Sequence, residues 1–349
     1  MTEENNTTSE KFTSFLKIDE DSKTPKYLQI VDTIVSDIEN GIFKIGERIP
    51  SINETSEEFY LSRDTVERAY KILKQKGLIL PVRGKGYYVA STGGPKKIRI
   101  LMLLNKLSEH KKTIFNAFRS KFDEDATIDL IVHNCNSYTL ESAIIENLGN
   151  YNYYVVMPHV DEVTDSMINA INKIPDSKLI LINQEIDGIE GHFSSVYEDY
   201  ENDIENALIS ELDDIQKYKK LKLVFPLTNH YRPSIKNGFT RFCESHKISY
   251  EIMDTFQDDL MKKGDLYIVI EEDDLCNIIK STRNKGLKLG QDVGLLCYND
   301  SPIKEILIGG ISVISTDFNR MGETAADFIL DKKTERVKNP FYLIKRNSF

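Results

Sequence analysis

The sequence has few cysteines and no long apolar run. Its four cysteines (Cys135, Cys243, Cys276 and Cys297) lie far apart in 349 residues and form no paired spacing. We therefore expect neither a disulfide framework nor a zinc ribbon, but buried, reduced thiols in the cytoplasm. No stretch of about 18 consecutive apolar residues is present, which excludes a membrane-spanning helix. The polar residues 1–13 also predict that no secretory signal is present.

Sequence signals for catalysis are scarce as well. The six histidines show no metal-ligand spacing, and no nucleophile–base pair can be identified from their order. The Gly-Lys-Gly segment at 84–86 is not followed by a predicted helix, as a phosphate-binding loop requires. Asp273 and Asp274 are adjacent on a predicted turn, where neighbouring side chains usually point apart. We therefore expect no enzymatic activity, no metal ion and no cofactor.

Positive charge is concentrated in one part of an acidic chain. The net charge of −10 argues at first against a nucleic-acid partner. However, residues 25–90 contain ten basic and nine acidic residues, whereas the rest of the chain contains 35 and 46. Within that segment, residues 63–85 hold seven basic residues against two acidic ones. Such a local excess is the electrostatic footprint of a nucleic-acid site.

Residues 25–90 show the pattern of a winged helix-turn-helix. Apolar residues recur at three- and four-residue steps between positions 28 and 38, which predicts a first helix. Ser51, with Glu54 three residues later, predicts a capping box for a second helix. Ser62 is the predicted N-cap of a third helix, and residues 78–90 read as two short strands around a glycine turn. The expected buried stripe of the third helix consists of Val66, Ala69, Tyr70 and Leu73.

Four motifs follow one another in this segment, namely PKYLQI, GIFKIGERIPS, SRDTV and GKG. In this order and spacing they resemble the GntR-family winged helix. The resemblance implies that the third helix enters the major groove with its N-terminal residues, and that the wing tip reaches the adjacent minor groove. The candidate DNA-binding residues are Ser51, Asn53, Arg63, Thr65, Glu67, Arg68, Arg83, Gly84 and Lys85.

The chemistry of these residues suits that role. An arginine can bond a guanine edge with two parallel hydrogen bonds, which discriminates by about 1–3 kcal/mol. A helix N-terminus offers free N–H groups to a phosphate. Asn53 and Glu67 depart from the family pattern, which often has Arg at both positions. Because Glu67 can accept a hydrogen bond from cytosine, we expect an operator that differs from the family's usual one.

The rest of the chain consists of short apolar runs separated by segments of helical length. The runs are IRILMLL, DLIVHN, YYVVMP, KLILIN, KLVFP, LYIVI and VGLLCY. This alternation implies parallel sheets that are buried on both faces, and roughly 250 residues suit two α/β lobes with a cleft between them. The predicted organisation is a mostly disordered arm (1–24), a winged helix (25–91), a linker (92–97), and a two-lobed domain for effector binding and dimerisation (98–349).

Residues 237–248, 265–302 and 314–330 resemble the LacI/GalR regulators and the periplasmic sugar-binding proteins, with overall coverage of about residues 97–330. A GntR head followed by such a sensor is the arrangement of arabinose-responsive repressors. This chain departs from the group at two positions. Ile235 stands where the group places a sugar-binding Arg, with Arg232 or Lys236 as possible substitutes, and Asn299 stands in place of an Asp.

In open α/β sheets, ligands bind beyond the carboxyl ends of the strands. Amide and carboxylate side chains suit hydroxyl-rich ligands, and Tyr298 could stack on a sugar face in a chain without tryptophan. An ordinary turn residue is the alternative interpretation at each position. No concentrated basic cluster follows the strands, which disfavours a phosphorylated ligand. The candidate effector-binding residues are Asn105, Asn134, His159, Asn183, Gln184, Arg232, Asp273, Asp274, Tyr298 and Asn299.

Together these patterns predict a homodimeric, cytoplasmic transcription regulator that binds double-stranded operator DNA and acts as a repressor. The expected effector is a monosaccharide such as a pentose or deoxyhexose, ahead of nucleosides and sugar phosphates. Two alternatives remain open at this point. One is a sugar-acting enzyme with a DNA-binding appendage, and the other is an activator of the same build.

Overall fold

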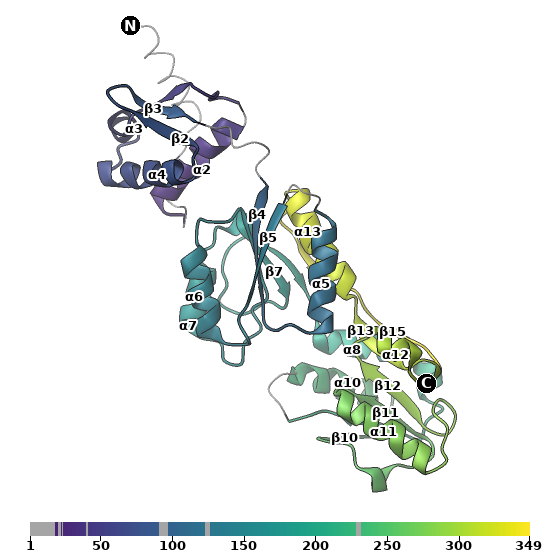
Figure 1. The fold of residues 1–349 in the computed structure, drawn as a ribbon. Coiled ribbons are helices and arrows are strands. Elements are labelled where there is room, and N and C mark those ends of the chain that lie inside the picture. Colours follow the sequence, from purple (N-terminus) through teal and green to yellow (C-terminus); the bar gives the residue numbers. More distant parts are fainter. Residues whose placement is uncertain are drawn as a thin grey trace.

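The molecule is elongated, with three bodies in a row: a head near the N-terminus, a first lobe and a second lobe (Figure 1). The computed structural model describes residues 18–19, 22, 24–39, 41–90, 97–122, 126–227 and 232–349. The predicted arm at 1–24 and the predicted linker at 92–97 lie almost entirely outside these ranges. Within them, no helix combines the length and hydropathy needed to cross a membrane.

The head contains the predicted three helices and two strands, and one further strand. Its elements are α2 (Lys26–Glu39), β1 (Arg48–Ile49), α3 (Ile52–Glu58), α4 (Arg63–Gln75), β2 (Ile79–Val82) and β3 (Gly86–Val89). β3 pairs antiparallel with both β1 and β2. The strand β1 is additional because two residues show no alternation. The predicted stripe of α4 is confirmed, since Val66, Ala69, Tyr70 and Leu73 are buried.

The helix caps of the head form as their residues predict. Ser51 Oγ accepts from the Glu54 backbone N–H at 3.2 Å, and the Glu54 carboxylate accepts from the Ser51 N–H at 2.6 Å. This reciprocal pair is the predicted capping box. At the start of α4, Ser62 Oγ accepts from the Thr65 N–H at 3.3 Å. The caps fix where α3 and α4 begin, and therefore which side chains lie at their exposed starts.

The first lobe is built on a fully parallel six-stranded sheet in the order β14-β8-β7-β6-β4-β5. The residues of β4 alternate between two cores: Ile100 and Met102 pack on one face of the sheet, Leu101 and Leu103 on the other. This explains why the strand is a continuous apolar run. The elements are β4 (Ile98–Leu104), α5 (Glu109–Ser120), β5 (Ala126–Val132), α6 (Ser137–Asn147), β6 (Tyr153–Val156), α7 (Asp165–Ile171), β7 (Leu179–Asn183), β8 (Ser194–Tyr197), α13 (Phe318–Leu330) and β14 (Arg336–Lys338).

The second lobe repeats this topology, with the sheet order β10-β9-β11-β12-β13-β15 and a single antiparallel strand, β15, at its edge. All seven predicted strands are present across the two lobes. β8, β10, β13 and β14 are additional because serine or charged residues interrupt their apolar character, and β15 is additional too. The elements are α8 (Tyr200–Ile209), α9 (Leu212–Ile215), β9 (Lys220–Val224), α10 (Pro233–Ser245), β10 (Tyr250–Met253), β11 (Asp265–Val269), α11 (Glu272–Asn284), β12 (Gly294–Tyr298), α12 (Pro302–Ile306), β13 (Ser312–Thr316) and β15 (Phe341–Ile344).

The chain crosses between the lobes three times: after β8, after β13 and after β14. Asn339 joins these crossings. Its backbone N–H donates to the Tyr197 carbonyl at 2.8 Å, and its side-chain amide donates to Thr316 Oγ1 at 2.8 Å and to the Asp317 carbonyl at 2.9 Å. One buried residue therefore links all three strands of the hinge.

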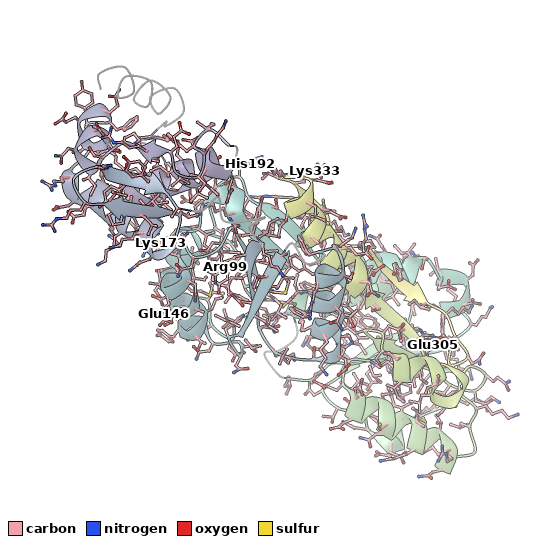
Figure 2. All side chains as sticks on the ribbon, turned by 45° about the horizontal axis from the view of Figure 1, so that its top comes forward. Arg99, Glu146, Lys173, His192, Glu305 and Lys333 are labelled. Carbon is pink, nitrogen blue, oxygen red and sulfur yellow. The ribbon has the colours of Figure 1, made fainter. Side chains whose placement is uncertain are left out.

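The head packs against one end of the first lobe. Lys178 Nζ lies 2.8 Å from the Asp32 carboxylate of α2. Gly149 lies so close to Leu28 that an added Cβ would be 2.9 Å from the leucine side chain. Lys173 lies at this same end of the lobe, beside a cavity that head residues also line (Figure 2). The head thus contacts the lobe through α2 and leaves α4 and the wing outside this contact.

Candidate functional site

The start of α4 presents several of the candidate DNA-binding side chains to solvent. Arg63, Glu67 and Arg68 are exposed, opposite the buried stripe of the helix. The Thr65 hydroxyl lies 2.7 Å from Ser62 Oγ and completes the cap. The Arg68 guanidinium stacks on the ring of Tyr27, 3.9 Å from its centroid. Arg68 is therefore held against α2, and Arg63 and Glu67 are the freer groups on this face.

The second helix and the wing flank this face. Asn53 is exposed on α3, next to the half-buried Ser51, whose hydroxyl caps that helix. Arg83, Gly84 and Lys85 are exposed at the turn between β2 and β3. Gly84 has φ +73°, which L side chains rarely adopt, and nothing lies within 4 Å of a Cβ built there. Backbone conformation, and not crowding, therefore explains the glycine at the wing tip.

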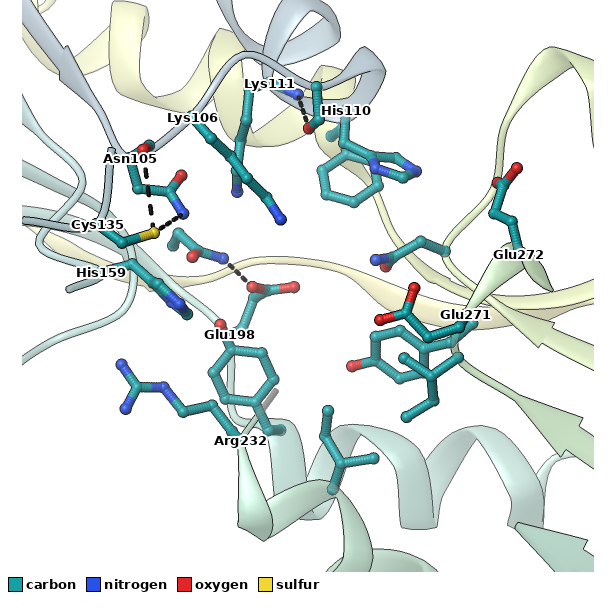
Figure 3. Close-up of a pocket in the computed structure, with 18 of the residues that line it drawn as sticks. Asn105, Lys106, His110, Lys111, Cys135, His159, Glu198, Arg232, Glu271 and Glu272 are labelled. Atoms are coloured by element: carbon teal, nitrogen blue, oxygen red, sulfur yellow. Dashed lines mark hydrogen bonds between the residues drawn. The ribbon is translucent and has the colours of Figure 1, made fainter. Parts of the chain in front are cut away.

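A cavity of about 270 Å³ lies between the two lobes, at the carboxyl ends of their strands (Figure 3). This volume is near the lower end of small-molecule sites, which span roughly 300–1,000 Å³. The lining residues are Asn105, Lys106, Ser108, His110, Lys111, Cys135, His159, Asn183, Glu198, Tyr200, Arg232, Ile235, Ile270, Glu271, Glu272, Tyr298, Asn299, Lys304 and Phe318.

The fold brings six of the ten predicted effector-binding residues to this cavity: Asn105, His159, Asn183, Arg232, Tyr298 and Asn299. Asn105 is 3 % exposed, and its Oδ1 has no hydrogen-bond partner among the described residues. Arg232 lines the cavity at the N-cap of α10, whereas Lys236 packs over the Phe225 ring. Of the two possible substitutes for the group's Arg, only Arg232 is therefore placed to contact a ligand.

The other four predicted residues do not line the cavity. Asn134 is an exposed turn residue with φ +52°. Gln184 is buried, donates to the Pro158 carbonyl at 3.1 Å, and accepts from the Arg232 guanidinium, so it orients Arg232. Asp273 and Asp274 fall in the first turn of α11, where the buried Asp274 carboxylate accepts from the Phe256 N–H at 2.9 Å. Gln184 and Asp274 are therefore engaged by other parts of the protein, and Asn134 and Asp273 lie outside the lining of the cavity.

Several cavity residues could not be predicted from their positions in the sequence. Lys111 lies on α5, and Glu198 follows β8, a strand that shows no apolar run. Glu271 and Glu272 begin α11 immediately before the aspartates that the sequence favours. Lys304 is buried below Asn299 and donates to its carbonyl at 2.9 Å. The fold alone places these residues beside one another.

The buried charges of the cavity perturb one another. Burial lowers the pKa of Lys111 to about 8, although the nearby Glu198 raises it. Burial raises the pKa of Glu198 to about 7, an effect that Lys111 opposes. Burial also lowers the pKa of His159 to about 4, and the positive charges of Arg232, Lys111 and Lys106 lower it further. The cations of the cavity are therefore close enough to act together on one imidazole.

Two other expectations concern metals and thiols. Among the residues that the structure describes, no three His, Cys, Asp or Glu side chains come together as a metal site. Cys135, Cys243 and Cys297 are buried, as expected, but Cys276 is exposed. The expectation of burial is wrong for Cys276 because it lies on the outer face of α11, away from the buried Leu275 and Ile278.

Two family profiles match this chain in separate segments. Residues 26–89 match the bacterial regulatory proteins of the gntR family, and residues 216–349 match the periplasmic binding protein-like domain. The chain therefore joins a head similar to the GntR winged helix to a domain similar to periplasmic binding proteins. The winged-helix and two-lobed α/β folds expected from the sequence are thereby confirmed.

Relatives with assigned names match only part of this chain. The transcriptional repressor YtrA of Bacillus subtilis is 36 % identical over 75 residues, which are 22 % of this chain and 58 % of that protein. The repressor NagR of the same organism is 32 % identical over 98 residues, 28 % and 39 % of the two chains. The arabinose metabolism transcriptional repressor of Geobacillus stearothermophilus is 39 % identical over 66 residues, 19 % and 18 %. The chain thus spans less than two thirds of each of these relatives.

Solved structures resemble the two lobes in fold. The lac repressor dimer bound to operator and an anti-inducer has a TM-score of 0.58 at 14 % identity, covering 73 % of this chain and 95 % of that one. A LacI family regulator from Enterococcus faecalis with bound ribose has a TM-score of 0.56 at 17 % identity, covering 72 % and 98 %. At these identities the likeness establishes the fold and not the ligand.

Proposed function

We propose that this chain is a sequence-specific transcriptional repressor whose affinity for operator DNA is controlled by a small molecule. The observation that carries the proposal is the combination, in one chain, of an exposed helix start and wing with an interlobe cavity that buries polar side chains. The matched relatives are named as transcriptional regulators, which supports regulation over catalysis. A repressor must have access to the DNA that it binds, so we propose a cytoplasmic location.

The proposed DNA contacts divide by position. Arg63 and Glu67 at the start of α4 read base edges in the major groove, while Arg83 and Lys85 flank the glycine of the wing in the minor groove. Ser51, Asn53, Thr65 and Gly84 approach phosphates, as does Arg68 from its place on Tyr27. Base contacts determine the preferred operator, whereas phosphate contacts add affinity for any sequence.

The proposed effector is a monosaccharide that binds in the interlobe cavity. Asn105, Asn183 and Asn299 would bond its hydroxyls, and Tyr298 would pack against its ring. Ligand binding would alter the angle between the lobes about the hinge at Asn339. In a homodimer that change would alter the spacing of the two heads, and two heads out of register with the half-sites bind weakly.

The test begins with selection of a preferred duplex from a random library, followed by titration of the full chain with that duplex and with a scrambled one at fixed salt. Arg63→Ala should weaken binding to the selected duplex by about 10- to 100-fold, since one bidentate base contact is worth about 1–3 kcal/mol. Arg83→Ala should also weaken it, because the variant loses a positive charge from the minor groove. Binding should weaken less for the scrambled duplex.

The matched control is Arg119→Ala, which removes an exposed arginine from α5 of the sensor. It should leave both affinities unchanged. Equal affinity of the wild-type chain for selected and scrambled duplexes would contradict sequence-specific repression. Unchanged affinity of both head variants would contradict the assignment of the DNA-binding face.

A further inference from the structure

Three cations reach the interlobe cavity from segments far apart in the sequence. Lys106 follows β4, Lys111 lies on α5, and Arg232 caps α10 (Figure 3). None of the three has a carboxylate within 4.0 Å among the residues that the structure describes. Their charges converge on His159, whose pKa they lower together with burial. Lys106, Lys111 and Arg232 therefore form a cationic end of the cavity, although they lie apart in the sequence.

Lys111 is the most informative of these side chains. The residue is only 9 % exposed, and within the described part of the chain its ammonium group makes no hydrogen bond or ion pair. A buried ammonium without a partner is costly, and proteins rarely retain one without a reason. Its side chain extends from α5 toward the cavity (Figure 3). The group is thus largely withdrawn from solvent at the place where a ligand would bind.

The carboxylates of the cavity do not neutralise this end. Glu272 lies 3.4 Å from the buried Lys304, and both belong to the second lobe. Glu198 already accepts a hydrogen bond from Asn183, and the hydroxyls of Tyr200 and Thr316 lower its pKa. Burial raises its pKa to about 7, so a fraction of the molecules carry it uncharged at neutral pH. Glu271 lies across the cavity from the lysines (Figure 3).

We propose that the effector is a monosaccharide bearing an acid group, a phosphate ester or a carboxylate, which binds against Lys106, Lys111 and Arg232. This inference rests on the proposed function and specifies the ligand class of the same cavity. It reverses the preference for a neutral pentose or deoxyhexose that the sequence suggests. That preference depends on the lack of a basic cluster after the strands, and the cluster forms only when α5, α10 and the β4 loop come together.

The cavity can hold both halves of such a ligand. The acid group would lie at the cationic end, where it supplies the counter-charge that Lys111 lacks. The hydroxyls would lie toward Asn105, whose buried Oδ1 is unpartnered among the described residues, and toward Asn183 and Asn299. Charge-assisted hydrogen bonds are roughly twice as strong as neutral ones. The acid group should therefore dominate the affinity.

Thermal unfolding and calorimetric titration of the full chain can test this with paired probes. The acid-bearing probes are ribose 5-phosphate, glucose 6-phosphate, gluconate and glucuronate, and the neutral ones are ribose, arabinose and glucose. At least one acid-bearing sugar should raise the Tm by several degrees at saturation, and its neutral parent should not. Binding of phosphate esters alone identifies a phosphate source, and binding of sugar acids alone a carboxylate source. Inorganic phosphate should compete only weakly.

Lys111→Met keeps the length of the side chain and removes its charge. It should weaken binding of the acid-bearing sugar by roughly 10- to 100-fold, without lowering the Tm of the unliganded protein. Arg232→Gln should act in the same direction. Lys112→Met and Arg119→Gln alter exposed side chains on α5 and should change neither quantity.

The inference would be overturned if Lys111→Met bound the acid-bearing sugar with wild-type affinity. It would also be overturned if unliganded Lys111→Met had a lower Tm than unliganded Lys112→Met, because Lys111 would then have a structural partner. Stabilisation by neutral sugars alone would overturn the acid-group inference but leave the proposed repressor intact. If no sugar binds while the chain still prefers its selected duplex, the monosaccharide effector itself fails. If the chain binds the selected and the scrambled duplex equally well, the proposed DNA-binding function is contradicted instead.

Discussion

At the end of β8, Glu198 is an acid in surroundings that disfavour its charge. Its carboxylate accepts a hydrogen bond from Asn183, and the hydroxyls of Tyr200 and Thr316 lower its pKa, yet burial still raises that pKa to about 7. Lys111 opposes this shift without forming an ion pair with it. The folded protein therefore holds a proton on Glu198 at pH values where the unfolded chain has released it.

The raised pKa of Glu198 predicts that the free energy of unfolding falls as pH rises. Between about pH 4.5 and 7 the folded state binds more protons than the unfolded state, so the free energy of unfolding decreases over that window. Glu198→Gln removes this dependence. The variant should therefore gain stability relative to wild type between pH 5 and pH 8, by on the order of 2 kcal/mol, measured by denaturant unfolding.

Glu146→Gln is the matched control, because Glu146 is exposed on the outer face of α6 (Figure 2). Its stability relative to wild type should not vary with pH. A Glu198→Gln variant whose relative stability is the same at pH 5 and pH 8 would show that the carboxyl group titrates normally.

Individual cavity residues differ in how far sequence could predict them. Asn105 and Tyr298 lie at the ends of apolar runs. Because ligands bind beyond the carboxyl ends of strands in such sheets, the sequence predicts both residues directly. Lys111 sits on a helix face that reads as an ordinary charged surface, and only the packing of α5 beside the cleft buries it. Burial of a lysine depends on what covers it, and local sequence does not contain that information.

At the scale of elements, the capping box of α3 combines a structural role with a proposed DNA contact. The Ser51 hydroxyl caps the helix through Glu54, whose carboxylate also pairs with Arg48 at 3.0 Å. The same hydroxyl lies on the proposed phosphate-facing side of the head. Two substitutions can therefore separate stability from binding.

Ser51→Ala removes the cap and should destabilise the head by about 1 kcal/mol. Ser51→Asp retains a capping oxygen, so the head should remain near wild-type stability. Its added negative charge should nevertheless weaken binding to the selected duplex by tenfold or more. Thermal unfolding and duplex titration of the full chain measure the two effects. Wild-type affinity in Ser51→Asp would remove Ser51 from the DNA-binding face.

Across the whole molecule, the hinge determines how the lobes can move. Asn339 is 1 % exposed and lies in the chain before β15, where three hydrogen bonds link it to the ends of β8 and β13. These bonds hold the three crossing segments together. The residue therefore lies where a change in the angle between the lobes would disturb these hydrogen bonds.

Asn339→Ala leaves the Thr316 hydroxyl and the Asp317 carbonyl without the amide donor. The free energy of unfolding should fall by about 1–3 kcal/mol, because these groups stay buried. Effector-dependent release of the selected duplex should also weaken. The control is Asn206→Ala, at an exposed position on α8, which should match wild type in both thermal unfolding and duplex release. Equal Tm values for the two variants would show that the hinge does not depend on this amide.

The sequence by itself determined the order of the bodies, the winged helix with its caps, and the seven apolar strands of the two lobes. These features arise from local periodicity and from capping residues a few positions apart, which physical rules connect directly to helices and strands. The tertiary structure alone decided which charges share the cavity. Lys106, Lys111 and Arg232 line one cavity because the carboxyl ends of both sheets face the same cleft. These residues are 5 to 126 positions apart in the sequence, and no local pattern predicts that they come together.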